Sequence, residues 1–313
     1  MAQVKTDKKL KICYIPYYGY EVDNFAFTDT YKRRWTNVLK NTLEKDGHSI
    51  ATYDINTIED SDYILSFDNT YFQNVRHFWH IWKAGKLGRT LHIDYEPPSA
   101  MIRIHSDRGL KVLSKLCTVM TYNDNVVNGR SIIKGVVGDY HEKERIYKHD
   151  FDKRKLLCMV ANNRTNKIPI KKWSSELYTA REEAARFFSE RCPEEFDLYG
   201  DYWPVEIKPK GVVDRDKKLD TISNYKFVIS YDSITHQNGY ISEKIFDIFA
   251  AKSIPIYWGA DNVTDYIPKE CFIDRRHFSS DEEVLRYIKN ISKKEYDNTI
   301  KAIEAYLASD QYK

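Results

Sequence analysis

The sequence lacks the short glycine patterns that mark two large classes of nucleotide-using enzymes. No GxGxxG follows an expected strand, and no GxxxxGK[ST] is present. The first absence argues against a nicotinamide-dependent dehydrogenase and the second against P-loop phosphoryl transfer. The cysteines are few and odd in number, without CxxC spacing: Cys13, Cys117, Cys158, Cys192 and Cys271. We therefore expect reduced thiols and no disulfide framework.

Long apolar runs and an excess of one charge are also missing. No segment approaches the ~20 apolar residues of a membrane span, and the charged N-terminus has no apolar stretch of the kind found in a secretory signal. The 49 Lys and Arg residues are nearly balanced by 46 Asp and Glu, which leaves a net charge of +3. This charge is too small to predict nucleic-acid binding. A pocket for a small phosphate-bearing ligand needs only a few cations, so this small net charge does not argue against such a pocket.

Patterns that would bind a metal ion are weak. His77 and His80 have helical i,i+3 spacing but no accompanying Cys or Glu ligands, so they are expected to be packing or surface residues. Asp214 and Asp216 form a DxD pattern typical of metal-diphosphate sites, but they lie in "GVVDRDKKLD", which has the composition of a solvated loop. We therefore expect no metal site.

The order of apolar segments indicates an α/β protein. The length of 313 residues suggests two domains at ~150 residues each. In the first half, strands are predicted at 10–18, 49–55, 62–67, 90–95 and 117–122, and helices at 29–48, 72–85 and 109–116. The first helix has Asp29 as its expected N-cap, a shared apolar face of Trp35, Leu39 and Leu43, and Gly47 as its stop. This alternation predicts parallel sheets covered by helices.

The second half restarts the same alternation. Strands are predicted at 156–163, 196–200, 225–232 and 254–259, and helices at 174–192, after Tyr240 and across 281–308. The charge-dense segment 141–155 between the halves is interpreted as a linker, with a solvated surface helix as the alternative. Because ligands of such sheets bind at the carboxyl ends of strands, the functional residues are expected just after strands.

The segment "NGYISEKIFDIFAAKSIPIYWG" (238–259) brings several polar side chains to the start of a helix. Helical spacing puts Tyr240, Glu243, Lys244 and Asp247 on one face, opposite a buried stripe of Ile241, Ile245, Ile248 and Phe249. A helix N-terminus favours an anion, and Lys244 adds a positive charge. By spacing alone, a surface helix with a Glu-Lys pair is the better interpretation of this segment.

The wider segment decides between these interpretations. It resembles the donor-binding signature of the α1,3/4-fucosyltransferase family (glycosyltransferase family 10) in Tyr240-Ile241-Ser242-Glu243-Lys244, Pro255, Trp258-Gly259 and Tyr266-Ile267-Pro268, densely over 225–273. The resemblance implies a GT-B protein with two Rossmann-like domains that face across a cleft. Residues 1–150 would bind the acceptor, and residues 151–313, with the C-terminal helices, would bind GDP-fucose.

The same resemblance implies which residues bind the donor. Tyr240, Glu243 and Lys244 match donor-contacting positions, and Asn162 stands at the end of the preceding strand. An Arg on the following helix would hold the diphosphate. We assign the diphosphate-binding role to Arg181, with Arg164 and Arg186 as the alternatives.

The N-terminal half matches the family more weakly. "HIDYEPPSA" and "VMTYND" occur in the family's order, so Glu96 matches the position of its general base. Tyr95 and Pro97 replace a Phe and a Ser, and the Arg that often follows Tyr122 is absent. We expect Tyr122 to contact the donor. Asp94 is the alternative to Glu96 as the general base.

The implied reaction moves L-fucose from GDP-fucose to an oligosaccharide or glycoconjugate, with inversion and an expected α1,3 linkage to a GlcNAc- or Glc-type sugar. Glu96 would deprotonate the acceptor hydroxyl, while Lys244 and Arg181 stabilise the leaving diphosphate. No cofactor is expected, and a divalent cation is at most a stimulant. The alternatives are another nucleotide sugar or a non-catalytic nucleotide-sugar or glycan-binding protein. Without an anchor or disulfides, a cytoplasmic location is expected.

Overall fold

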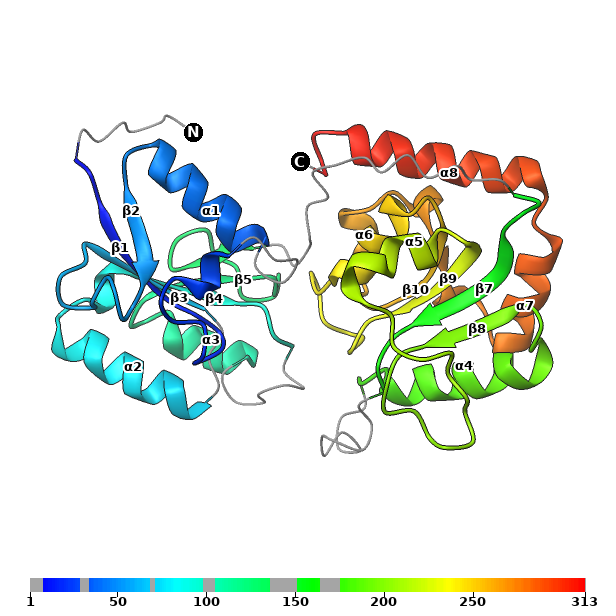
Figure 1. The fold of residues 1–313 in the computed structure, drawn as a ribbon, viewed down its shortest axis with the longest axis horizontal. Coiled ribbons are helices and arrows are strands. Elements are labelled where there is room, and N and C mark those ends of the chain that lie inside the picture. Colours follow the sequence, from blue (N-terminus) through cyan, green and yellow to red (C-terminus); the bar gives the residue numbers. More distant parts are fainter. Residues whose placement is uncertain are drawn as a thin grey trace. The chain divides into compact units, whose positions relative to one another are not determined.

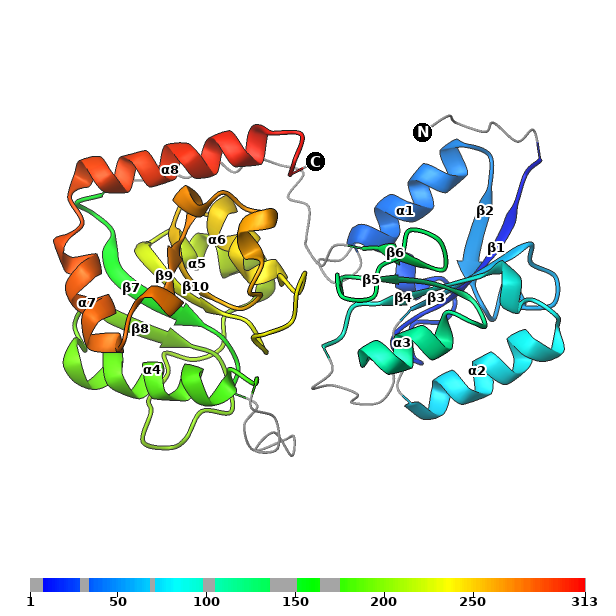
Figure 2. The same ribbon diagram turned by 180° about the vertical axis from the view of Figure 1, so that it is seen from behind.

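The computed structural model describes residues 8–28, 34–67, 71–97, 105–135, 151–163 and 175–312. The chain divides into two compact units, Met1–Val136 and Val137–Lys313, shown in Figure 1 and from behind in Figure 2. Most of the predicted linker at 141–155 lies outside the described residues, as do Asp29 and Arg164. The roles predicted for the two domains stay predictions.

The N-terminal unit is built on a parallel sheet with strand order β2-β1-β3-β4-β5-β6. Its elements are β1 (Lys11–Ile15), α1 (Arg34–Lys45), β2 (Ser49–Thr52), β3 (Tyr63–Phe67), α2 (Tyr71–Lys83), β4 (Thr90–Asp94), α3 (Asp107–Leu113), β5 (Thr118–Thr121) and β6 (Ile132–Lys134). Helix α1 covers one face of the sheet, and α2 and α3 cover the other (Figure 1). The strand order reverses between β1 and β3, which makes this the topological switch point of the unit.

Helix α1 follows the expectation from its apolar pattern. Trp35, Leu39 and Leu43 pack against a core that includes Tyr14 and Ile50 from β1 and β2. Gly47 has a φ of +83°, a left-handed conformation that glycine adopts without strain and that commonly ends a helix. The predicted face and stop of this helix are therefore confirmed.

The C-terminal unit repeats the design with strand order β11-β10-β9-β7-β8, all parallel. Its elements are β7 (Lys155–Val160), α4 (Tyr178–Arg191), β8 (Phe196–Tyr199), α5 (Lys218–Ile222), β9 (Tyr225–Tyr231), α6 (Glu243–Ala250), β10 (Ile254–Trp258), β11 (Ile273–Asp274), α7 (Asp281–Asn290) and α8 (Lys293–Ala308). Helices α5 and α6 lie on the sheet face opposite α4 (Figures 1 and 2). Here the order reverses between β7 and β9, so the switch point lies between these strands.

Helix α6 differs from its prediction. It begins at Glu243 after the N-cap Ser242, so Tyr240 lies in the preceding loop and not on the helix. The buried stripe Ile241, Ile245, Ile248 and Phe249 is confirmed. The opposite side is not a solvated face, since Asp247 is fully buried. The interpretation as a surface helix is therefore wrong.

Three short elements were not predicted: α5, β6 and β11. Each contains five residues or fewer, too few to show a period of apolar residues. Helix α5 begins within the stretch 211–220, which was expected to be a solvated loop. Its first residue, Lys218, becomes important for the site.

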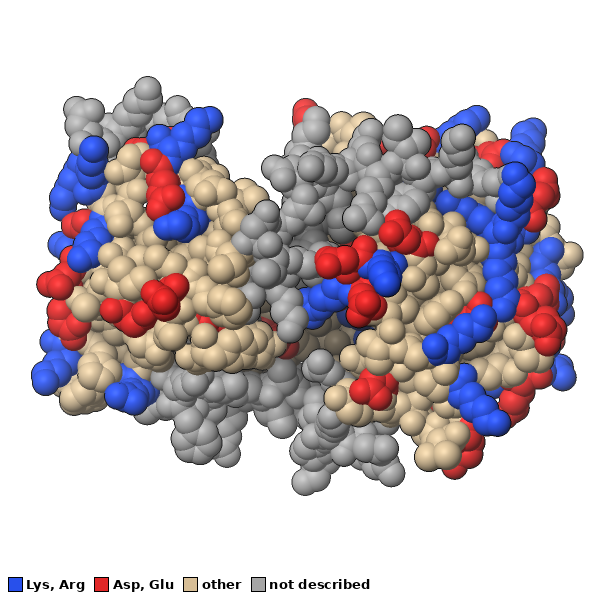
Figure 3. Space-filling view, in the orientation of Figure 1, with Lys and Arg blue, Asp and Glu red and all other residues tan. Residues whose placement is uncertain are grey.

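General features of the chain agree with its composition. All five cysteines are free and buried. None of the helices among the described residues combines the length and hydropathy that a bilayer-spanning segment needs. Basic and acidic side chains are interspersed on the faces of both units seen in Figure 3, in keeping with the small net charge.

Candidate active site

A pocket opens at the switch point of the C-terminal unit, between β7 and β9. The space between its lining residues is about 340 Å³, part of which is open solvent. The residues that line it are Met159, Val160, Ala161, Arg181, Lys218, Ile222, Val228, Ile229, Tyr231, Lys244 and Ile248. Most are apolar, and the charged ones are all cations. This is the position at which an open parallel sheet binds its ligand.

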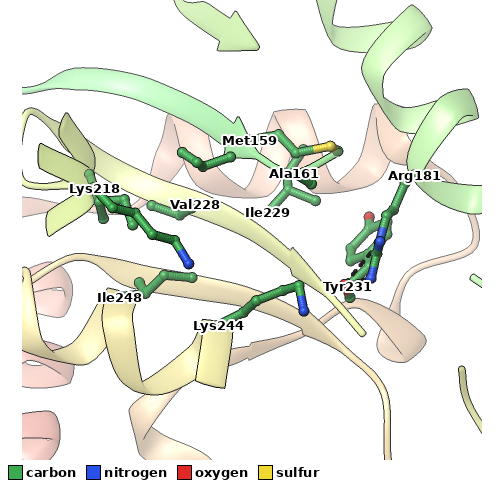
Figure 4. Close-up of a pocket in the computed structure, with 11 residues that line it drawn as sticks. Met159, Ala161, Arg181, Lys218, Val228, Ile229, Tyr231, Lys244 and Ile248 are labelled. Atoms are coloured by element: carbon green, nitrogen blue, oxygen red, sulfur yellow. Dashed lines mark hydrogen bonds between the residues drawn. The ribbon is translucent and has the colours of Figure 1, made fainter. Parts of the chain in front are cut away.

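The three cations of the pocket come from three different helices. Arg181 extends from the first turn of α4, Lys218 from the start of α5 and Lys244 from the start of α6, and Figure 4 shows them around the same hollow. A mostly apolar pocket with three positive side chains in its lining suits a ligand that has a flat apolar part and a charged phosphate part. The geometry therefore favours a nucleotide over a neutral ligand.

Arg181 is held in place by the backbone of β9. Its Nε and Nη2 donate to the carbonyl oxygen of Tyr231 at 3.0 and 2.7 Å, and its guanidinium lies 4.7 Å from the ring centre of Tyr178. The side chain is nearly buried, with 4% exposed. Among the described residues no carboxylate pairs with Arg181, so its charge faces the pocket.

The alternative arginines are not placed in this pocket. Arg186 lies further along α4 and binds the carboxylates of Glu182 and Glu206, at 3.0 and 3.7 Å. Arg164 lies outside the described residues. Arg181 and Arg186 are the two candidates for the diphosphate role that the structure describes. Of these two, only Arg181 lines the pocket at the switch point.

Lys244 lies above a buried polar network at the ends of β9 and β10. Its ammonium donates to Ser242 Oγ at 3.1 Å, and the Ser242 hydroxyl donates to Asp232. The other carboxylate oxygen of Asp232 accepts from Tyr257 Oη at 2.7 Å. Because the Ser242 hydroxyl donates to Asp232, the Ser242 side chain does not cap α6. The first turn of α6 therefore keeps the features of an anion site.

Burial raises the pKa of Asp232 above the usual range, although Lys244, Ser242 and Tyr257 all favour the ionised form. Gly259 lies directly against the network: a Cβ at this position would lie 2.2 Å from Tyr257 Oη and 2.4 Å from Asp232 Oδ2. Glycine is thus required here by close approach, which gives a physical reason for the Trp-Gly step that ends β10.

Lys218 forms a buried ion pair with Asp247 of α6 at 2.5 Å. Burial acts to lower the pKa of Lys218, but Asp247 and Glu243 outweigh it, and the result is a raised pKa. Lys218 therefore stays charged at the wall of the pocket. The sequence does not single out Lys218 as a site residue, because Lys217 and Lys218 in a polar stretch resemble two ordinary surface lysines.

Glu243 and Tyr240 are close to the site but do not line this pocket. Glu243 is half-buried, with its carboxylate 3.6 Å from the Lys244 ammonium. Burial acts to raise its pKa, but Lys244 and Lys218 outweigh that effect and lower it. Tyr240 is 5% exposed, and its backbone N–H donates to the Gln237 carbonyl. Their predicted role as donor contacts stays a prediction.

Asn162 lies two residues after the end of β7 and contacts the loop after β8. Its side-chain oxygen accepts from the backbone N–H of Asp201 at 2.9 Å. Gly200 passes so close that an added Cβ would lie 1.9 Å from the Ala161 carbonyl oxygen. Asn162 therefore shapes the rim at the carboxyl end of β7, and its contact with a donor stays a prediction.

In the N-terminal unit, Glu96 lies two residues beyond the end of β4, and its side chain is half-buried. Asp94, the rival base, is fully buried, and both of its oxygens are occupied. One contacts His105 Nδ1 and the other accepts from Thr121 Oγ1 at 2.6 Å. Asp94 is therefore enclosed by its own contacts, whereas Glu96 is half-buried.

Tyr122 lies in the interior of the N-terminal unit. Its side chain is completely buried, and its hydroxyl donates to the Glu96 carbonyl oxygen at 3.4 Å. The cause of this burial is that Tyr122 directly follows β5, the neighbour of β4 in the sheet. Tyr122 therefore helps to hold the Glu96 backbone, and its contact with the donor stays a prediction.

The two metal-like patterns lie in different surroundings. Asp214 and Asp216 are both exposed, at a short 3-10 turn, and His77 packs edge-on against Tyr53 at 4.8 Å. Within the described residues, no group of three or more His, Cys, Asp or Glu side chains is arranged to hold a metal ion.

Comparisons with known proteins give this geometry a family. Residues 153–300 match the family model described as "Glycosyltransferase family 10 (fucosyltransferase) C-term". The C-terminal unit belongs to glycosyltransferase family 10. All three pocket cations and the Asp232 network lie inside this family 10 segment.

Curated relatives match over part of their length. The mouse 4-galactosyl-N-acetylglucosaminide 3-alpha-L-fucosyltransferase 9 is 28% identical over 144 residues, which cover 45% of this chain and 34% of the relative. The Arabidopsis thaliana alpha-(1,4)-fucosyltransferase is 39% identical over 70 residues, covering 22% of this chain and 17% of the relative. The chain thus spans about a third or less of the length of these two relatives.

Solved structures extend the likeness to the whole chain at the level of fold. An α1,3-fucosyltransferase solved with GDP-fucose has a TM-score of 0.58 and 17% identity, covering 99% of this chain and 93% of its own. T4 phage BGT, in complex with UDP and Mn²⁺, has a TM-score of 0.56 and 10% identity, covering 97% and 96%. The predicted GT-B class of fold is confirmed.

Proposed function

We propose that this protein transfers L-fucose from GDP-fucose to a hydroxyl group of a glycan, with inversion at the anomeric carbon. One observation carries the proposal: Arg181, Lys218 and Lys244 converge from three helices on an apolar pocket at the β7–β9 switch point, within the family 10 segment. The GDP-fucose complex of an α1,3-fucosyltransferase of the same fold supports this choice of donor.

The three cations are proposed to stabilise the leaving diphosphate. When the glycosidic bond of the donor breaks, negative charge grows on the phosphate, and fixed positive groups lower the barrier most. Arg181 offers a planar fork, whereas Lys218 and Lys244 act as point charges. We propose that these groups supply the required charge, so that no metal ion is needed. Loss of transfer on addition of a chelator would contradict this.

Glu96 is proposed to be the general base. It would accept the proton of the acceptor hydroxyl as that oxygen attacks the anomeric carbon. Its half-buried position fits this role, and Asp94, with both oxygens occupied, does not. We propose an α1,3 linkage from the names of the mouse relative and of the solved α1,3-fucosyltransferase; the name of the Arabidopsis relative makes α1,4 the alternative.

The test is an incubation of the full chain with GDP-fucose and a panel of oligosaccharides, analysed by mass and proton NMR. The expected product gains one deoxyhexose in α linkage, which means inversion because the donor linkage is β. Parallel incubations with UDP-glucose address the alternative of a UDP-sugar donor, which the UDP complex of T4 phage BGT suggests. Consumption of UDP-glucose alone would replace the proposed donor, and binding without any turnover would support the non-catalytic alternative.

A further inference from the structure

A row of aromatic rings follows the carboxyl edge of the N-terminal sheet. Tyr17, Tyr18 and Tyr20 come just after β1, Phe67 ends β3 and Tyr95 follows β4. We call these five residues the aromatic platform. Because β1 pairs with β3, and β3 with β4, the platform spans the switch point of this unit, the preferred ligand position of such a sheet.

The rings of the aromatic platform contact one another in sequence. Tyr18 stacks on Tyr20 with 5.2 Å between ring centres and 16° between planes, and Tyr17 lies edge-on to Tyr18 at 4.5 Å. Tyr17 reaches Phe67 at 6.2 Å, and Phe67 reaches Tyr95 at 5.7 Å. Tyr95 is the residue before Glu96, so the platform leads directly to the proposed base.

The outer end of the platform is open to solvent. Tyr18 is 44% and Tyr20 57% exposed, although their rings are large and apolar. Exposed aromatic rings beside a sheet's ligand edge are typical of a binding surface. Tyrosine combines a flat apolar face with a hydroxyl, which suits the C–H face and the hydroxyl rim of a pyranose.

The loop that carries the platform is fixed in place. The backbone N–H of Asn24 donates to Thr52 Oγ1 at 2.9 Å, and Asn24 Oδ1 accepts from the Thr52 N–H at 3.1 Å. The Glu21 N–H closes a turn onto the Tyr18 carbonyl at 3.0 Å. The platform is therefore preorganised, which reduces the entropy lost on binding.

The charge of this loop selects against a phosphate-bearing ligand. From residue 16 to residue 24 the chain carries Glu21 and Asp23 but no Lys or Arg. The cations that suit a nucleotide lie instead in the C-terminal unit. We propose that the aromatic platform binds a neutral pyranose of the acceptor glycan, with the sugar ring lying on the Tyr18–Tyr20 pair. This inference rests on the proposed function, since it names the acceptor site of that reaction.

The test compares the Tyr18→Ala/Tyr20→Ala chain with a matched control. Tyr63→Ala removes a comparably exposed tyrosine, 48% exposed, from the amino end of β3 in the same unit. The KM for the best neutral acceptor of a β-galactoside and β-N-acetylglucosaminide panel is measured, together with the Kd for GDP-fucose. We expect about a tenfold rise in acceptor KM for the double variant, with Tyr63→Ala and the donor Kd unchanged. Tyr18→Phe/Tyr20→Phe should retain most of the affinity, because the ring faces remain.

The outcomes separate the two proposals. A wild-type chain that neither binds nor consumes GDP-fucose refutes the proposed function. A wild-type chain that hydrolyses GDP-fucose, but gives no saturation-transfer NMR signal with any neutral sugar of the panel, refutes only the aromatic platform. An unchanged acceptor KM in the double variant also refutes the platform, as does an equal loss in Tyr63→Ala.

Discussion

Arg181 and Tyr231 are joined at a single acceptor: two nitrogens of the guanidinium donate to one backbone carbonyl oxygen at the end of β9. The carbonyl belongs to the sheet, so the direction of the Arg181 side chain is set by the fold before any ligand binds. The planar fork of arginine makes this arrangement possible, and a lysine ammonium cannot reproduce it.

Replacing Arg181 by Lys should therefore weaken donor binding even though the charge is kept. Hydrogen bonds to charged groups contribute about 1.5–3 kcal/mol, so we expect the Kd for GDP-fucose to rise about 10- to 100-fold. Arg186→Lys on the same helix is the control, because Arg186 binds only surface carboxylates among the described residues. Equal affinities of the two variants in calorimetry would show that Arg181 does not contact the donor.

Lys218→Met should destabilise the C-terminal unit. The change leaves the fully buried Asp247 without its ion-pair partner, which typically costs about 3–5 kcal/mol. Combining it with Asp247→Leu should restore at least half of the loss, since an apolar pair of similar volume replaces the ion pair. Urea unfolding and hydrogen exchange of α5 and α6 measure both effects. If the Lys218→Met chain were as stable as wild type, the Lys218–Asp247 ion pair would contribute little to the free energy of unfolding.

Gly259→Ala should disturb the Asp232 network through overlap alone. The added methyl group would meet Tyr257 Oη and Asp232 Oδ2, both buried, and overpacking of this kind costs about 1–3 kcal/mol. Gly88→Ala is the control, because its added methyl group would have no heavy atom within 4 Å and its φ is not left-handed. Matching melting temperatures for the two variants would argue against the close approach.

The N-terminal unit should lose stability as pH falls from 6.5 towards 4. Burial lowers the pKa of His92 to about 4, from 6.5 in the unfolded chain. The neutral form is therefore favoured on folding, and its contribution is present above pH 6.5 and lost as pH falls through 4. The shift corresponds to about 3 kcal/mol at most. Hydrogen exchange of β4 amides should show this slope in wild type, and a His92→Phe chain that keeps the full slope would contradict it.

The order of helices and strands in this fold is predictable from the sequence, whereas the contacts between distant segments are less so. The alternation of strands and helices is set by apolar periodicity, and the likeness to family 10 predicts a donor site in the segment from Tyr240 to Gly259. Lys218 could not be predicted, because its burial depends on α6 lying over α5. Asp232 was missed for a similar reason: its partners Ser242 and Tyr257 come from two other segments.

The choice between neighbouring residues also required the structure. Glu96 and Asp94 are both plausible bases by position in the sequence, and only the contacts of Asp94 with His105 and Thr121 separate them physically. In the same way, the burial of Tyr122 follows from the pairing of β4 with β5, which a single sequence does not specify in register.

The most direct test of the account is Glu96→Gln, assayed for both transfer and donor binding. The change removes a proton acceptor while keeping shape, and general-base catalysis contributes about 10²- to 10⁴-fold. We predict that fucose transfer falls by at least about 100-fold, whereas the calorimetric Kd for GDP-fucose stays within about twofold of wild type. Near-normal turnover of Glu96→Gln would contradict the assignment of Glu96 as the base, and loss of GDP-fucose binding would contradict the division between donor site and base.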